Sequence, residues 1–250
     1  MRTRTPPTET YRTKRDSETS FAGPLAATGI LLASIGLAAG GPSAANYLAT
    51  AAQDREYRNF DPEKVMTTTV DAAAANVIEL AGGATATIDG SETFISKNIK
   101  DPTTGKTVNP IISFDPVDRE VTIGVGVDYV AKNGFPDQSQ SYNTIFKVDP
   151  GSPLLTMPEG ASLTGKDMAQ ALEQGDLRFE GLVISASRGD TPQTQGGSRL
   201  SSVKRDSTGE LVAYSSLPTA GKRHPGDYGY KPIVKEVAQD TQEIIEDSQS

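Results

Sequence analysis

The chain has 250 residues, of which 36% are hydrophobic and 22% are charged, and it carries a net charge of −8. It contains no cysteine and one histidine, which excludes disulfide frameworks, thiolate metal sites and multi-histidine metal sites within one chain. The first twenty residues hold five basic and three acidic side chains, so the remainder carries −10 and is a poor surface for nucleic acid, whose phosphates require basic partners.

Residues 1–20 are polar and rich in threonine, and this composition predicts a disordered cytoplasmic tail. No charged residue occurs between Phe21 and Gln53. The stretch 21–41 is about long enough to cross a bilayer as a helix, and the basic residues before it predict an N-in, C-out orientation. We therefore expect a single-pass signal-anchor helix at 21–45, with the following domain outside the cytoplasm in the cell envelope.

Two other interpretations of this stretch stay open. Residues 25–39 also suit the apolar region of a secretory signal peptide, with small residues at Ser43 and Ala45 before a cleavage site, and the product would then be secreted. A buried helix of a soluble fold is the other interpretation. In a membrane helix, small residues at four-residue spacing would allow close helix packing, although simple alanine and glycine richness also explains them: Gly29, Ala33, Gly36 and Gly40.

Residues 46–83 predict a membrane-proximal helical segment. Asp61 can cap a helix, Pro62 suits the first helical position, and Gly82-Gly83 ends the apolar periodicity. The run Thr67–Thr69 weakens this prediction, because β-branched residues disfavour helices.

From residue 84 the apolar period changes to two, which predicts strands at 84–88, 93–99, 108–114, 120–130 and 142–148. In 120–130 one face is apolar, and the other contains Gly124 and Gly126, which suggests a bulge or a close neighbour. A short helix capped by Thr164 and ended by Gly175 follows, then a strand at 177–187, a hairpin at 201–204 and 210–215, and an irregular loop at 218–232.

Residues 233–247 have the spacing of an amphipathic helix, with Val234, Val237, Ile244 and Ile245 on one side. This side either docks a protein partner or packs on its own domain. The pattern as a whole predicts an α+β fold with a mostly antiparallel β-rich extracytoplasmic domain at 84–231, two or three short helices, and an acidic C-terminal helix at 232–250.

Candidate chemistry is sparse. Arg188-Gly189-Asp190 matches an integrin-recognition tripeptide on an expected loop, although the same residues are ordinary turn formers, and they are the candidate binding residues. Asp115, Asp118 and Glu120 cluster near the strongest strand and could support hydrolysis only if burial separates their pKa values. His224 has no nucleophile motif to form a triad with it.

The layout of a hydrophobic helix, a helical extension and a β-rich domain is similar to that of type IV pilins and pseudopilins. Ser20-Phe21 stands where that family has a Gly-Phe-type processing site, and residues 21–53 lack the acidic residue that the family carries near the start of the helix. The resemblance therefore covers the architecture alone.

These patterns favour a membrane-anchored envelope protein with a non-catalytic binding or assembly domain. Its expected partners are the lipid bilayer, through residues 21–41, and a protein, through the C-terminal helix; no cofactor, metal or nucleic acid is expected. The alternatives are an extracytoplasmic hydrolase that uses paired carboxylates, and a secreted soluble domain.

Overall fold

The computed structural model describes residues 55, 57–130, 136–188, 198–216 and 221–250. The expected membrane helix, with Gly29, Ala33, Gly36 and Gly40, lies outside these residues. Within them the chain has the predicted α+β fold, with three α-helices and a mostly antiparallel sheet. The helices are α2 (Pro62–Ala81), α3 (Gly165–Glu173) and α4 (Tyr230–Gln249), and a 3₁₀ turn, η1, spans Pro153–Thr156.

The main sheet has nine strands, in the order β11-β10-β9-β8-β6-β5-β4-β2, with β3 also paired to β4. Their bounds are β2 (Thr93–Ser96), β3 (Ile99–Lys100), β4 (Lys106–Asp115), β5 (Glu120–Val130), β6 (Pro136–Val148), β8 (Leu177–Arg188), β9 (Ser198–Arg205), β10 (Leu211–Ser215) and β11 (Gly221–Arg223). A separate pair joins β1 (Thr85–Thr87) to β7 (Ser162–Thr164). All these pairings are antiparallel.

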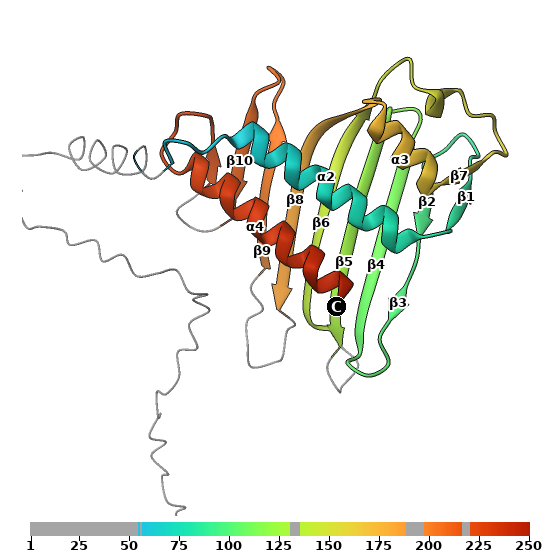
Figure 1. Ribbon diagram of the computed structural model, residues 1–250, viewed down its shortest axis with the longest axis horizontal. Coiled ribbons are helices and arrows are strands. Elements are labelled where there is room, and N and C mark those ends of the chain that lie inside the picture. Colours follow the sequence, from blue (N-terminus) through green and yellow to red (C-terminus); the bar gives the residue numbers. More distant parts are fainter. Residues whose placement is uncertain (1–54, 56, 131–135, 189–197, 217–220) are drawn as a thin grey trace, which may run out of the picture.

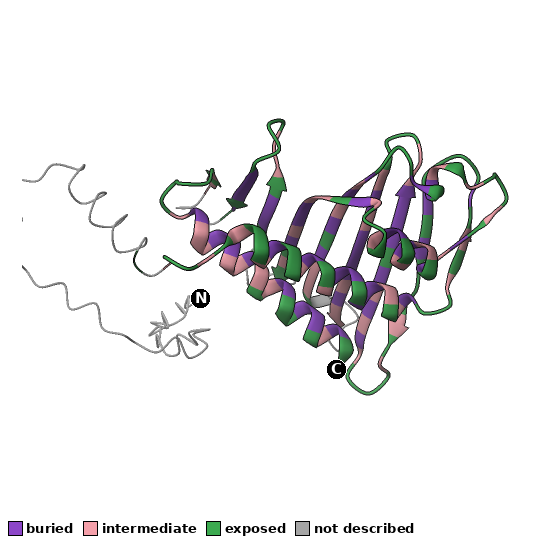
Figure 2. Ribbon diagram, turned by 45° about the horizontal axis from the view of Figure 1, so that its top comes forward, coloured by how far each residue is buried: buried purple, intermediate pink, exposed green. Residues whose placement is uncertain are grey.

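The molecule has two layers (Figure 1). Helices α2 and α4 lie side by side across one face of the sheet, and α3 packs against α2 on that same side. Both long helices turn their buried residues toward the sheet and their exposed residues outward (Figure 2). The core between the layers includes fully buried large side chains from both, among them Met66, Ile112, Phe114, Ile123, Tyr142 and Phe146.

Helix α2 begins as its sequence predicts, because Asp61 Oδ1 accepts a hydrogen bond from the backbone N–H of Lys64 and Pro62 occupies the first turn. The three threonines do not break the helix. Each hydroxyl donates to the carbonyl four residues earlier, so Thr67, Thr68 and Thr69 are satisfied within the helix.

A buried polar network joins both long helices to the centre of the sheet. The Tyr142 hydroxyl lies 2.9 Å from the carbonyl oxygen of Ala73 and 2.8 Å from Asn76 Oδ1, and Ser248 Oγ lies 3.2 Å from the same Oδ1. Asn76 Nδ2 has no partner in this orientation. Exchanging the two amide atoms lets Nδ2 donate to both hydroxyls, which then donate to the carbonyls of Ala73 and Ile245.

The end of α4 is fixed to the sheet by a second polar cluster. Asp247 accepts hydrogen bonds from the hydroxyl of Tyr129 and, at 2.7 Å, from Nε2 of Gln140. Lys106 Nζ donates to the carbonyl of Asp247 at 2.7 Å and to Ser250 Oγ at 2.9 Å. Burial, together with the adjacent Asp247 carboxylate, raises the pKa of Tyr129 to about 12, so its hydroxyl stays a donor at neutral pH.

The apolar side of α4 is buried in its own domain. Val234, Val237, Ile244 and Ile245 contribute to the core, and the sequence had left open whether this side docks a partner or packs internally. Helix α2 contributes to the same core. The segments that sequence reasoning separates at residues 83 and 232 therefore share one hydrophobic core with the sheet.

Candidate functional site

The most extensive candidate surface is the face of the sheet opposite the helices, which no element of the described residues covers (Figures 1 and 2). We call it the open face. Its side chains form rows, because partners in an antiparallel sheet lie side by side across the strands. The central row consists of consecutive partners from β2 to β10: Ser96, Ile111, Gly124, Asn143, Val183, Ser202 and Tyr214.

Two further rows flank the central one. On one side lie Phe94, Ser113, Thr122, Ile145, Gly181, Lys204 and Val212, and on the other Asn109, Gly126, Ser141, Ser185 and Leu200. Only Lys204 is charged in these three rows, which we call the uncharged band. Beyond it, charged residues follow toward both strand ends, with Glu120 paired to Lys147 in register on one side and Asp128 on the other.

The uncharged band has its most exposed apolar side chains at its two ends, and its middle strands present mostly small or polar residues apart from Ile145 and Val183. Phe94 and Ile111, on β2 and β4, are 54% and 40% exposed, and Leu200 and Tyr214, on β9 and β10, are 42% and 38% exposed. The middle strands present Gly124, Gly126, two serines and Asn143. Ser141 Oγ and Ser185 Oγ lie 2.8 Å apart, so these two hydroxyls satisfy each other across β6 and β8. An uncharged centre with a charged rim is the usual composition of a protein interface.

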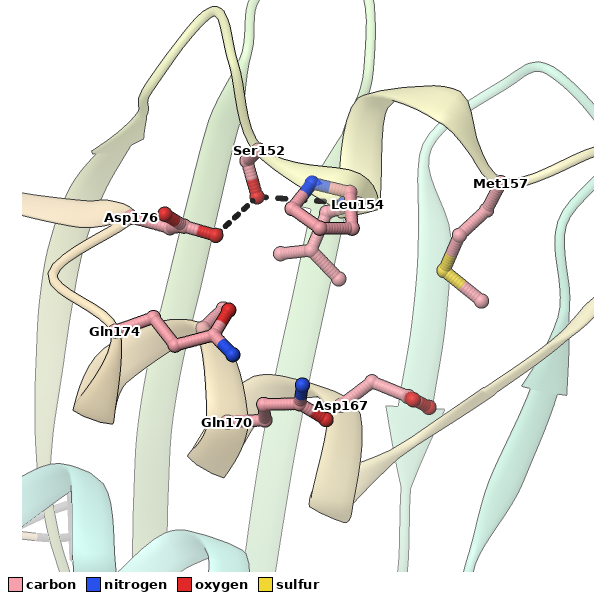
Figure 3. A pocket seen from close by; sticks show the side chains of 9 residues that line it. Ser152, Leu154, Met157, Asp167, Gln170, Gln174 and Asp176 are labelled. Atoms are coloured by element: carbon pink, nitrogen blue, oxygen red, sulfur yellow. Dashed lines mark hydrogen bonds between the residues drawn. The ribbon is translucent and has the colours of Figure 1, made fainter.

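A small pocket lies between η1 and α3, on the helical side of the sheet (Figure 3). Buried Ser152 donates from Oγ to Asp176 Oδ2 at 2.9 Å, and the amides of Gln170 and Gln174 point toward the same space. The cavity measures about 130 Å³, below the several hundred Å³ typical of small-molecule sites. His224, the single histidine of the sequence, follows β11 at the far edge of the sheet, so it does not lie beside the serine and the aspartate.

A second depression lies at the strand ends around Arg119, Lys147 and Arg178. Two of its cations are compensated: Lys147 pairs with Glu120 at 3.1 Å, and Arg178 pairs with Glu180 at 2.7 Å. Arg119 is the one non-glycine residue of the described chain with a positive φ, at 52°. It occupies the last position of the β4–β5 turn, where its carbonyl accepts from the N–H of Val148.

Arg119→Gly is expected to raise the free energy of unfolding by about 0.5–1 kcal/mol. Glycine removes the left-handed strain, which outweighs its greater entropy loss on folding. Denaturant unfolding of the purified chain measures the change. Arg119→Ala is the matched control, because it removes the same charge and keeps the Cβ. An equal gain in both variants would assign the effect to charge and contradict the strain explanation.

One cluster of the described residues has metal-ligand types at close range. Ligand atoms of Asp206, Glu210 and His224 lie within 4.8 Å of one another, and His224 Nδ1 lies 3.5 Å from Glu210 Oε2. Asp206 already closes the β9–β10 turn, since its Oδ1 accepts from Thr208 N and Oγ1 and from the N–H of Glu210. These bonds, the Thr208 hydroxyl first, lower the pKa of Asp206. The hydrogen bonds of the turn therefore explain the position of the Asp206 carboxylate without a bound metal ion.

The carboxylates proposed for hydrolysis do not form a buried pair. Asp115 Oδ1 accepts from the N–H groups of Val117 and Asp118 and thereby holds the β4–β5 turn. Glu120 forms its ion pair with Lys147, and both side chains are about two-fifths exposed. Such solvated carboxylates lack the contrasting environments that acid–base catalysis requires.

The tripeptide predicted to bind begins at the end of β8. Arg188 is the last residue of that strand, while its side chain, Gly189 and Asp190 lie outside the described residues. Sequence reasoning did not identify the open face. Its one signal was the second face of 120–130, where the two glycines suggested a bulge or a close neighbour.

Comparison of the chain with protein-family models, with curated proteins and with solved structures gives no match. Among the described helices, none combines the length and the apolar character needed to cross a bilayer. The function therefore has to be argued from the N-terminal sequence and from the surface of the folded part.

Proposed function

We propose that the chain is an envelope protein, anchored through residues 21–41, whose folded part binds or assembles through the open face of its sheet. The observation that carries the proposal is the uncharged band. It presents four large apolar side chains to solvent, on a face that no element of the described residues covers. Clusters of exposed apolar side chains mark interaction sites, and the band has one such pair at each of its ends.

The arrangement of the helices supports a role for this face. Helices α2, α3 and α4 all lie on the opposite side, so none of them covers the band. The sheet edges are less suited to assembly by strand addition, since β11 has three residues and β2 has four. A partner of the folded part is thus expected on the face of the sheet.

The anchor is supported by the 33 uncharged residues 21–53 that follow a basic segment. The absence of cysteine makes its topology measurable with single-cysteine variants. In intact cells of a bacterial host, Ser207→Cys, on the exposed β9–β10 turn, is expected to react with a membrane-impermeant maleimide, and Ser17→Cys is expected to react only after lysis.

Fractionation of the same cells completes the test. Full-length protein in a carbonate-resistant membrane fraction is the expected result. A soluble product that starts near Asn46 would replace the anchor by a cleaved signal peptide. A soluble full-length protein, with Ser207→Cys protected in intact cells, would refute the envelope location.

A further inference from the structure

We infer that the occupant of the open face is a second copy of this chain, bound sheet to sheet about a two-fold axis that runs parallel to the strands between β6 and β8. This inference rests on the proposed role of that face in binding or assembly. Two properties of the uncharged band lead to it: its area and its pattern of large and small side chains.

The area suits a stable dimer. Seven strands at about 4.8 Å spacing and three rows at about 6.8 Å give a band of roughly 700 Å². A standard protein interface buries about 800 Å² on each partner. The band is therefore large enough for specific association without help from the charged strand ends.

The side-chain pattern is self-complementary about this axis. Because β6 and β8 are the two middle strands of the eight from β11 to β2, the rotation places β8 of one copy over β6 of the other, β9 over β5, β10 over β4 and β11 over β2, with each row facing itself. A large residue then meets a small one where Leu200 faces Gly126. Near the ends of the band, Ile111 faces Tyr214.

Gly126 makes its contact with Leu200 compatible with close packing of the sheets. A Cβ on Gly126 would meet nothing within 4 Å in the single chain, so the space above it is unfilled until a partner side chain enters. Two sheets packed face to face lie about 10 Å apart, and alternating large and small residues let their side chains interdigitate. Leu200 of the second copy fits this requirement at Gly126.

The test uses the full chain in its membrane or soluble fraction, whichever contains it. Ser185→Cys is nearly isosteric and lies beside the proposed axis, and a bis-maleimide about as long as the roughly 10 Å between packed sheets is expected to link two copies. Ser207→Cys, exposed on the β9–β10 turn, is the matched control and is expected to stay unlinked. Equal linking at both positions would overturn the inference.

Mass measured by light scattering gives the second readout. Wild-type chain is expected to be dimeric at micromolar concentration, and Ser185→Glu is expected to raise the dimer dissociation constant about 100-fold or more, because the rotation buries each new carboxylate over Ser141 of the other copy without a charged partner. Ser207→Glu should leave the dimer intact. A monomeric wild type, or a dimer that Ser185→Glu does not weaken, would overturn the sheet-to-sheet contact. The proposed membrane anchor is tested separately, by the fractionation experiment.

Discussion

Replacing Tyr142 with alanine is expected to lower the free energy of unfolding by about 3–5 kcal/mol, the usual cost of removing a buried aromatic ring. The ring is fully buried at the centre of β6, beneath α2. Its hydroxyl also belongs to the network with Ala73, Asn76 and Ser248, which joins both long helices to the sheet. The substitution therefore creates a cavity and leaves polar groups without a partner.

Tyr142→Phe separates the two contributions. It retains the ring, so the expected loss is about 1–3 kcal/mol, from the unsatisfied groups that remain in a buried site. Denaturant unfolding with an unchanged m value measures both variants. Tyr228→Ala serves as the control: this tyrosine is exposed, and its loss should change stability by less than about 0.5 kcal/mol. A Tyr142→Ala variant as stable as this control would contradict the packing described for α2 on β6.

Gly124→Ala is expected to destabilise the chain by about 1–3 kcal/mol, the range for overpacking a close contact. A Cβ at this position would meet Asn143 Oδ1 at 2.1 Å and the carbonyl oxygen of Tyr142 at 2.8 Å. The amide of Asn143 can rotate away, whereas the Tyr142 carbonyl is held in the sheet. Strands β5 and β6 must therefore separate slightly to admit the methyl group.

Gly126→Ala is the matched control in the same strand, two residues further on the same face. Its Cβ would meet nothing within 4 Å in the single chain, so at concentrations where the chain is monomeric this variant should be neutral or more stable by up to about 1 kcal/mol. The double variant Gly124→Ala/Asn143→Ala should recover part of the loss, because only the carbonyl contact persists. Equal effects of the two single alanine variants on unfolding would refute the close approach at Gly124.

Local sequence signals predicted most elements of the described fold. The strand Glu120–Val130 has the predicted bounds, because its alternation is strict over eleven residues. Helix α2 begins after Asp61 and ends before Gly82, as the cap and stop signals indicate. Thr164 caps α3 as predicted, and its side chain also exchanges hydrogen bonds with Asp167 in a capping box.

Other features depended on contacts that a single sequence does not display. Strand β11 has three residues, Gly221–Arg223, and no alternation, so its region reads as a loop; it forms by pairing with β10. The position of α2 beside α4 on one face of the sheet depends on packing between segments far apart in the chain. The open face was missed for a related reason: its rows run across the strands, and each strand contributes only two or three residues to the band.

The polar cluster at the end of α4 has a consequence for how the protein reaches its folded state. Lys106 contacts Asp247, 141 positions later, and the first and last helices of the described chain cover the same sheet face. Contacts of such long sequence separation close late and slow folding. A chain threaded through a translocon from its N-terminus would hold an incomplete core until α4 emerged, which keeps it unfolded and competent for transport. Because α4 completes the core, a truncated chain that ends before Tyr230 would fold poorly and would expose the apolar face of the sheet to proteases.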